Sequence, residues 1–251
     1  MDIVSNSGVL INYEVIGEGY PIVMIHGIHG SLQDWKIYGY PKLLSNYQLI
    51  LIDLRGHGNS SKVYDPDLYD PKIQASDIRA VLKDLSIQRA HIWGYSYGAR
   101  TAFAMAIYFP NYVSGLYVGA LHPYPVFNIL HKIKDRQKLL KIGLEVYLAE
   151  MNPGYTKEQI TLFLKNDQVA LIQMDESIIN WEGFGDDLNR LKNVEFPIIL
   201  YLGSKDRSYL ELADTFFHDF PNTKKVMLEG YRHFDVFTNA KIIVEAIQEY
   251  F

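Results

Sequence analysis

The stretch His91-Ile-Trp-Gly-Tyr-Ser-Tyr-Gly-Ala-Arg100 decides the fold, because it places the pattern Gly94-x-Ser96-x-Gly98 between a short apolar run and a helix-forming run. A strand that turns directly into a helix forces its apex residue into a strained backbone, and small flanking residues let neighbouring backbone pass. The Tyr97 amide then lies at the start of the helix, where unpaired N–H groups favour a negative oxygen. Ser96 is therefore a candidate nucleophile and Tyr97 a candidate oxyanion-hole donor, although two glycines around a serine also mark ordinary loops.

Length and composition fit one large domain with a full core. The chain has 251 residues, 48% of them hydrophobic, and no low-complexity run. A net charge of −5 without a basic stripe makes nucleic acid a poor partner and favours a small-molecule substrate. The chain lacks cysteine, which excludes disulfides and thiol catalysis. It shows no signal-peptide pattern and no apolar run near the roughly 20 residues of a membrane span, so we expect a cytoplasmic protein.

Apolar strands alternate with helical patterns through the first half of the chain. Residues 8–17 alternate in polarity, which predicts an antiparallel strand that pairs with residues 3–4. Short runs that are apolar throughout predict parallel strands buried on both faces: 21–25, 48–52, 91–93 and 113–120. Helical patterns occupy 32–45, the segment from Pro71, and the segment after Ser96. This alternation predicts a mostly parallel sheet with site loops at the strand C-termini.

The rhythm changes between residues 122 and 193. Charged helical segments at 132–150 and 156–166 replace the strand-helix alternation there, followed by a loop at 181–185. We predict a helical cap, 122–193, inserted into a core formed by 1–121 and 194–251. Six of its aromatic residues are candidates to line a substrate pocket, although such residues also form a cap's own core: Tyr124, Phe127, Tyr147, Phe163, Trp181 and Phe184. Among them, Tyr124, Trp181 and Phe184 are the candidates for substrate binding.

A serine hydroxyl needs a base within hydrogen-bond reach, and that base needs a carboxylate to hold its tautomer. Asp206 follows the predicted strand at 198–202, and His233 follows the last predicted strand at 226–228. Both therefore lie at the same sheet edge as Ser96, in the chain order Ser, Asp, His. Asp175, Asp186, Asp187 and Asp235 are weaker choices for the carboxylate, and His57 in its glycine-rich loop is a structural hydrogen-bonding residue.

The loop at 26–30 offers the second oxyanion donor. It follows the predicted strand at 21–25 and is rich in glycine, so it can turn the amide of Ile28 towards Ser96, or it can simply be a tight turn. A reaction at these groups needs neither a metal nor an organic cofactor.

The chain resembles the α/β-hydrolase family over essentially its whole length. The likeness rests on His26-Gly27, the Asp53-x-Arg55-Gly-His-Gly-x-Ser60 loop, Gly94-x-Ser96-x-Gly98, Gly203-x-x-Asp206 and Gly230-x-x-His233. It implies an eight-stranded, mostly parallel sheet with helices on both faces and an inserted cap, and the triad Ser96, Asp206 and His233. We expect a serine hydrolase of a small carboxylic ester. A hydrolase-like receptor that keeps the pocket and senses a ligand is the alternative outside enzymes.

A narrower resemblance concerns Arg100. The segment Gly94-Tyr-Ser-Tyr-Gly-Ala-Arg100, with His26-Gly-x-x-Gly-Ser31 and Trp35, is similar to the menaquinone-pathway synthases of this family. These enzymes eliminate pyruvate with the same triad, and their arginine holds a substrate carboxylate. The chain departs from their pattern at His122-Pro-Tyr-Pro-Val126. We therefore favour a salt bridge from Arg100 to Asp34 or Asp53.

Overall fold

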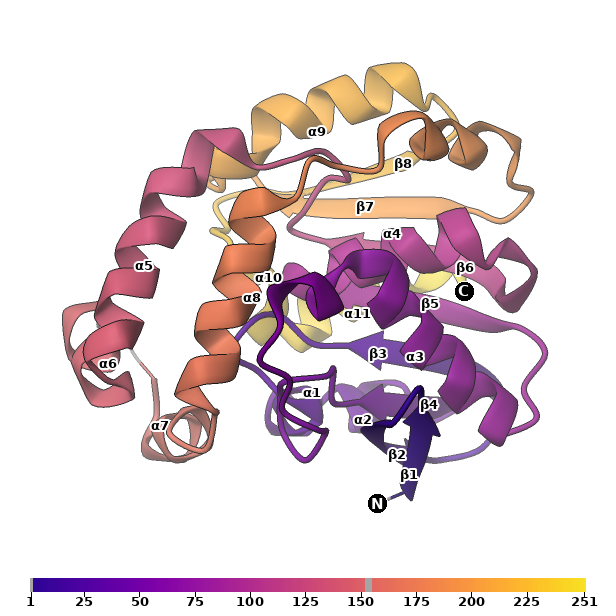
Figure 1. Ribbon diagram of the computed structural model, residues 1–251. Coiled ribbons are helices and arrows are strands. Elements are labelled where there is room, and N and C mark those ends of the chain that lie inside the picture. The colour runs from indigo at the N-terminus through magenta and orange to yellow at the C-terminus, as the bar shows by residue number, and fades with distance from the viewer. Residues whose placement is uncertain (1, 152–154) are drawn as a thin grey trace.

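The computed structural model describes residues 2–151 and 155–251, which form one eight-stranded sheet in the order β1-β2-β4-β3-β5-β6-β7-β8 (Figure 1). β2 pairs antiparallel with β1 and β4, and every other neighbouring pair is parallel. The strands are Asp2–Asn6, Val9–Ile16, Tyr20–Ile25, Tyr47–Ile52, Ala90–Tyr95, Val113–Gly119, Ile198–Gly203 and Lys224–Leu228. The predicted α/β fold with a mostly parallel sheet is confirmed.

Helices cover both faces of the sheet. On one face, α3, α4 and α9 pack against sheet residues such as Val23 and Ile92. On the other face, α1, α2 and α11 pack against residues such as Met24 and Trp93. The inner strand β5 is buried along its whole length, because both faces are covered. These six helices span Pro71–Asp84, Tyr97–Tyr108, Arg207–Asp219, Leu32–Ile37, Tyr40–Leu43 and Ala240–Ile247.

Four further helices lie together beyond one end of the sheet, at the left of Figure 1: α5 (Leu130–Ile142), α6 (Leu144–Met151), α7 (Lys157–Phe163) and α8 (Gln168–Asn180). Their buried residues, among them Leu140 and Met174, belong to the same apolar cluster as one face of the sheet. This segment therefore packs onto the sheet without a core of its own. The division of the chain at residues 122 and 193 stays a prediction.

Several helices differ from their predicted limits. The helical stretch expected at 32–45 is two helices, because Gly39 adopts a left-handed backbone (φ 83°) between α1 and α2. The stretch expected at 132–150 divides at Gly143 into α5 and α6. Helix α8 was not predicted, although Asp167 caps it by accepting the amide hydrogen of Ala170 at 2.8 Å.

Candidate active site

Ser96 lies at the sharp turn between β5 and α4, with a backbone that few non-glycine residues adopt (φ 50°, ψ −114°). Its neighbouring glycines make the turn possible. A Cβ at Gly94 would lie 2.3 Å from the carbonyl oxygen of Gly98, and a Cβ at Gly98 would lie 2.4 Å from that of Ile25. Neither space admits a side chain, so the spacing of the motif is a packing requirement of this turn.

A chain of hydrogen bonds joins three side chains from three strand ends. Ser96 Oγ lies 2.8 Å from Nε2 of His233, and Nδ1 of His233 lies 2.7 Å from Oδ2 of Asp206. Since a carboxylate only accepts, Nδ1 carries the imidazole proton, and Nε2 accepts the hydrogen of the Ser96 hydroxyl. Asp206 is buried at the start of α9, whereas His233 is half-exposed after β8. The structure thus brings together the three residues that the motifs single out.

Two tyrosines that the sequence did not single out hold His233 in place. The ring of Tyr209 stacks on the imidazole with centroids 4.9 Å apart, and the Tyr95 hydroxyl donates to the carbonyl oxygen of His233 at 3.0 Å. Tyr209 follows Asp206 by three residues, one turn into α9. His233 is therefore held at its ring by Tyr209 and at its backbone by Tyr95, besides the carboxylate of Asp206.

The competing carboxylates lie elsewhere. Oδ2 of Asp235 accepts the amide hydrogen of Arg232 at 2.8 Å, and Asp175 is buried in an ion pair with Arg136. The other two lie in the turn after α8, where Asp186 is exposed and Asp187 pairs with Arg190. Among the residues that the structure describes, Asp206 is the carboxylate that hydrogen-bonds to His233.

The loop that carries Ile28 passes directly beside the nucleophile. A Cβ built on Gly27 would lie 3.5 Å from Cβ of Ser96 and 3.0 Å from the ring of Tyr95, so a larger residue at 27 would push the loop away. Tyr97 is the first residue of α4, and its amide has no acceptor within the helix. Both residues line the cavity that holds Ser96. The pairing of these two amides as an oxyanion hole stays a prediction.

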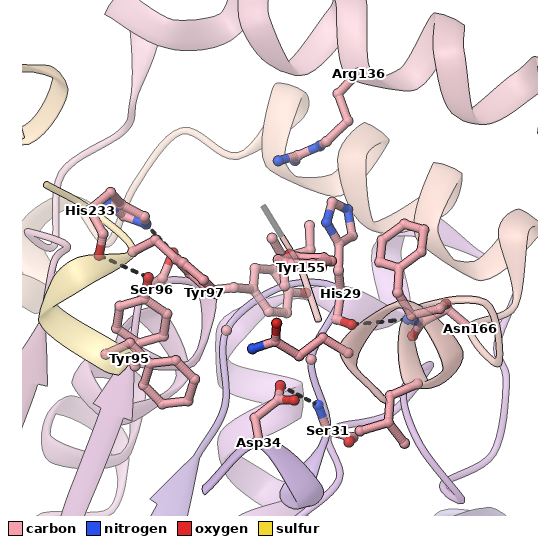
Figure 2. Close-up of a pocket in the computed structure, with 18 of the residues that line it drawn as sticks. His29, Ser31, Asp34, Tyr95, Ser96, Tyr97, Arg136, Tyr155, Asn166 and His233 are labelled. Carbon is pink, nitrogen blue, oxygen red and sulfur yellow. Dashed lines mark hydrogen bonds between the residues drawn. The ribbon is translucent and has the colours of Figure 1, made fainter. Parts of the chain in front are cut away.

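A cavity of about 820 Å³ lies between the strand ends and the four helices α5 to α8, here called the cap helices, and Ser96 and His233 line it. Figure 2 shows these two residues at one side and His29 and Asn166 at the other, with Tyr155 between them. Its wall includes residues from both the sheet loops and the cap helices: Asp34, Tyr38, Arg100, Arg136, Phe163 and Phe234. The volume falls within the range of small-molecule sites.

The three aromatic residues predicted to bind substrate do not line this cavity. Tyr124 donates its hydroxyl hydrogen to Asp219 at 2.7 Å, outside it. Trp181 and Phe184 pack edge to face with ring centroids 5.0 Å apart, and Trp181 lies under Arg100. Two other aromatic residues that the sequence offered as pocket lining, Tyr147 and Phe163, do line the cavity. They are joined there by Tyr38 and Tyr155, which no local motif marks.

The predicted salt bridge of Arg100 is absent, and this expectation was wrong. Within the described residues Arg100 forms no ion pair, and its buried Nε has no hydrogen-bond partner. Asp53 is instead bonded to the Leu32 amide at 2.8 Å, and Asp34 to the Ser31 amide at 3.1 Å. Arg100 lines the cavity with its guanidinium 4.3 Å from the Trp181 ring, and burial lowers its pKa to about 10.

The buried histidines divide into two groups. His57 packs on His26 with ring centroids 4.7 Å apart and forms no hydrogen bond with His233 or Ser96, as expected of a structural residue. His29 was not singled out by the sequence, yet it lines the cavity and packs edge to face against the rings of Tyr147 and Phe163. Burial, and then the charge of Arg136, lowers the pKa of His29 well below its ordinary value, so its ring is neutral at pH 7.

The described residues contain neither a cluster of metal ligands nor a helix suited to a membrane span. In residues 2–151 and 155–251, no group of three or more histidine, cysteine, aspartate or glutamate side chains could hold a metal ion. In the same two ranges, no helix has the length and apolar character needed to cross a bilayer.

The chain is similar to known proteins with the alpha/beta hydrolase fold. A family model described as the alpha/beta hydrolase fold matches residues 20–128. The AB hydrolase superfamily protein YisY of Bacillus subtilis is 30% identical over 77% of each chain. A second protein of that bacterium, named as a 2-succinyl-6-hydroxy-2,4-cyclohexadiene-1-carboxylate synthase, is 25% identical over 79% of this chain and 80% of its own.

Solved structures agree on the fold. An esterase from Exiguobacterium antarcticum superimposes with a TM-score of 0.85 over 99% of this chain and 97% of its own, at 20% identity. The relatives carry names of different reactions, and as a group they indicate a hydrolase. The strand order, the turn at Ser96 and these relatives lead to one conclusion: the chain belongs to the α/β-hydrolase superfamily.

Proposed function

We propose that this protein is a serine hydrolase that cleaves a small carboxylic ester through an acyl-enzyme intermediate. The observation that carries the proposal is the unbroken hydrogen-bond chain from Ser96 through His233 to Asp206, which opens into the cavity. A hydroxyl becomes a nucleophile at neutral pH when an adjacent base takes its proton, and this arrangement supplies such a base.

Each group then has a defined role. His233 Nε2 takes the hydroxyl proton as Ser96 Oγ attacks the ester carbonyl, and Asp206 stabilises the imidazolium that forms. The amides of Ile28 and Tyr97 hold the carbonyl oxygen as it gains negative charge, where one such donor is worth about 100- to 1000-fold in rate. His233 then gives its proton to the leaving alcohol. Water attacks the acyl-enzyme by the same proton path and releases the acid.

The proposal is tested by turnover of short p-nitrophenyl esters together with labelling by an organophosphonate, read by intact mass. Wild-type protein should hydrolyse the esters and take up one label, and Ser96→Ala should do neither. Ser208→Ala is the matched control, because Ser208 also lines the cavity and its hydroxyl accepts a hydrogen bond from Lys132 at 3.2 Å. Labelling of Ser96→Ala, or folded wild-type protein that neither turns over nor labels, would overturn the proposal.

One observation favours a second candidate, a lyase that eliminates pyruvate from a carboxylated substrate. Arg100 lines the cavity without a carboxylate partner among the described residues. One of the relatives is named as a synthase whose product name includes a carboxylate. In this reading Arg100 binds the substrate carboxylate, and His233 and Ser96 move a proton without forming an acyl-enzyme. Stoichiometric acyl-enzyme formation with p-nitrophenyl esters would separate the two candidates.

A further inference from the structure

Asp34 is a carboxylate in the cavity wall that the proposed reaction does not use. It lies in the first turn of α1, and its Oδ2 accepts the amide hydrogen of Ser31 at 3.1 Å, which completes a capping box (Figure 2). A neutral glutamine fills the same role in many capping boxes, so the cap alone does not require a charge. The negative charge of Asp34 therefore needs another explanation.

No cation of the protein balances this charge. Asp34 forms no ion pair with a lysine, arginine or histidine anywhere in residues 2–151 or 155–251. Burial raises the pKa of Asp34 to about 7, helped by the nearby charge of Asp53. A carboxylate held in an enclosed site without a partner is unfavourable, and a cation from outside the chain would relieve it.

Aromatic rings share the cavity wall with the carboxylate of Asp34. Tyr38, Tyr155, Phe234 and Phe237 all line the cavity with Asp34. They form one continuous wall, because Tyr38 contacts both phenylalanines, with ring centroids 5.1 Å from Phe237 and 6.2 Å from Phe234. Tyr155 in turn contacts Phe234 at 5.8 Å. Burial, and then the charge of Asp34, raises the pKa of Tyr38, which places that ring within the electrostatic reach of the carboxylate. Aromatic faces beside a carboxylate are the features that bind an alkylammonium group.

A short turn of the backbone connects the surroundings of Asp34 with those of the nucleophile Ser96. The amide of Gly30 donates to the carbonyl oxygen of Gly27 at 3.2 Å, so residues 27–30 form a tight turn. At one end of the turn, Gly27 lies against Ser96; at the other, a Cβ on Gly30 would lie 2.4 Å from Oδ2 of Asp34. One ligand can therefore reach both groups in a cavity of about 820 Å³.

We propose that Asp34 and the aromatic wall of Tyr38, Tyr155, Phe234 and Phe237 form a subsite for an alkylammonium group of the ligand. As a statement about substrate this rests on the proposed function, in which the ester carbonyl lies at Ser96. The subsite itself is a binding property and can be measured without turnover.

The first experiment compares binding of choline with that of its uncharged carbon isostere, 3,3-dimethylbutan-1-ol, by calorimetry. Wild-type protein should bind choline more tightly by about tenfold or more. Asp34→Asn keeps an oxygen for the Ser31 amide and should remove that preference, whereas Asp186→Asn, at an exposed position outside the cavity, should keep it. Equal affinities in wild-type protein, or an unchanged preference in folded Asp34→Asn, would overturn the subsite.

A second measurement needs no variant and covers the case in which Asp34→Asn does not fold. Choline affinity of wild-type protein should fall by about tenfold between pH 8 and pH 5.5 as Asp34 takes up a proton, while the affinity for the alcohol stays level. Tyr38 and Tyr155 also face Asp34, and their pKa values are raised above the ordinary tyrosine value, so neither titrates in this range. The same pH response of both ligands would contradict the role of Asp34.

Turnover separates this inference from the proposed function. Wild-type protein should hydrolyse butyrylcholine with a kcat/KM about tenfold above that of 3,3-dimethylbutyl butyrate, and Asp34→Asn should equalise the two. Hydrolysis of both esters at equal rates would refute the subsite and leave the serine hydrolase standing. Preferential binding of choline without hydrolysis of either ester would refute the hydrolase and leave the subsite standing.

Discussion

Arg100→Met gives the sharpest test of what the cavity binds. Burial lowers the pKa of Arg100 from its ordinary 12.5 to about 10, a shift equivalent to a penalty of about 3 kcal/mol for the buried charge. The cation–π contact of its guanidinium with the Trp181 ring at 4.3 Å offsets about 0.5–2 kcal/mol of this penalty. The charge therefore destabilises the fold by about 1–3 kcal/mol, because no carboxylate among the described residues pairs with it.

Methionine at position 100 should therefore keep or raise the melting temperature, by about 2–4 °C for each kcal/mol gained in a chain of this size. The expected loss is in binding. A ligand with a carboxylate should bind about 10- to 150-fold more weakly, which corresponds to a lost charge-assisted pair, and a neutral ligand of equal size should be unaffected.

The assay combines scanning calorimetry with KM for two p-nitrophenyl esters of matched length, one neutral and one ending in a carboxylate. Arg79→Met is the control, because Arg79 also covers an aromatic ring, that of Phe109 at 4.5 Å, but lies outside the cavity. A melting temperature several degrees lower in Arg100→Met, with an unchanged KM for the carboxylated ester, would show that Arg100 is structural and would refute this reasoning.

Three further outcomes follow from the geometry. Asp206→Asn should lower kcat for p-nitrophenyl esters by about 10⁴ through loss of tautomer control, whereas Asp235→Asn should change it only a few-fold; equal effects would place the carboxylate elsewhere. The folded pKa of Asp34 is raised to about 7, so wild-type protein loses stability as pH rises from about 4 to 7. The free energy of unfolding of Asp34→Asn, measured in urea, should exceed that of wild-type protein by about 1–4 kcal/mol at pH 8 and should not exceed it at pH 4. Burial lowers the folded pKa of His122 to about 4, so the free energy of unfolding should fall as pH drops from 6.5 towards 4. His122→Asn should make that loss smaller by up to about 3 kcal/mol, as measured by urea unfolding at the two pH values.

Much of the fold and of the hydrogen-bonded site could be predicted because their signals are local. An apolar run with a glycine-bearing loop after it predicts where a buried strand ends, and parallel strands bring those ends to one edge. Ser96, Asp206 and His233 each follow such a run, and the structure joins them at 2.8 and 2.7 Å. The glycines at 94 and 98 are explained by the same local geometry, since backbone occupies the space of a side chain at both.

The cavity lining could not be predicted in the same way. Tyr38, just after α1, and Tyr155, just before α7, line it because these two segments meet over the strand ends, and that meeting is set by tertiary packing. Of the aromatic residues offered by the sequence, Tyr147 and Phe163 line the cavity, whereas Trp181 and Phe184 pack on one another. An aromatic residue in a helical segment has the same apolar pattern whether it faces a core or a cavity, so the pattern alone does not separate the two.

The charged residues of the cavity wall were also not predictable from the sequence, and they indicate which residues set substrate specificity. A sequence predicts a salt bridge by assuming that a buried charge finds a partner, and Arg100 contradicts that assumption in this chain. Asp34, an anion without an ion-pair partner among the described residues, contradicts the same assumption. Arg136 also lines the cavity, but it forms an ion pair with Asp175, so the pair adds little net charge to the wall. Arg100 and Asp34 line one cavity, and neither forms an ion pair with another described residue. Each therefore retains a stability penalty that a ligand group of opposite charge would remove. We therefore expect these two groups, more than the hydrogen-bonded Ser96, His233 and Asp206, to determine which substrate this protein accepts.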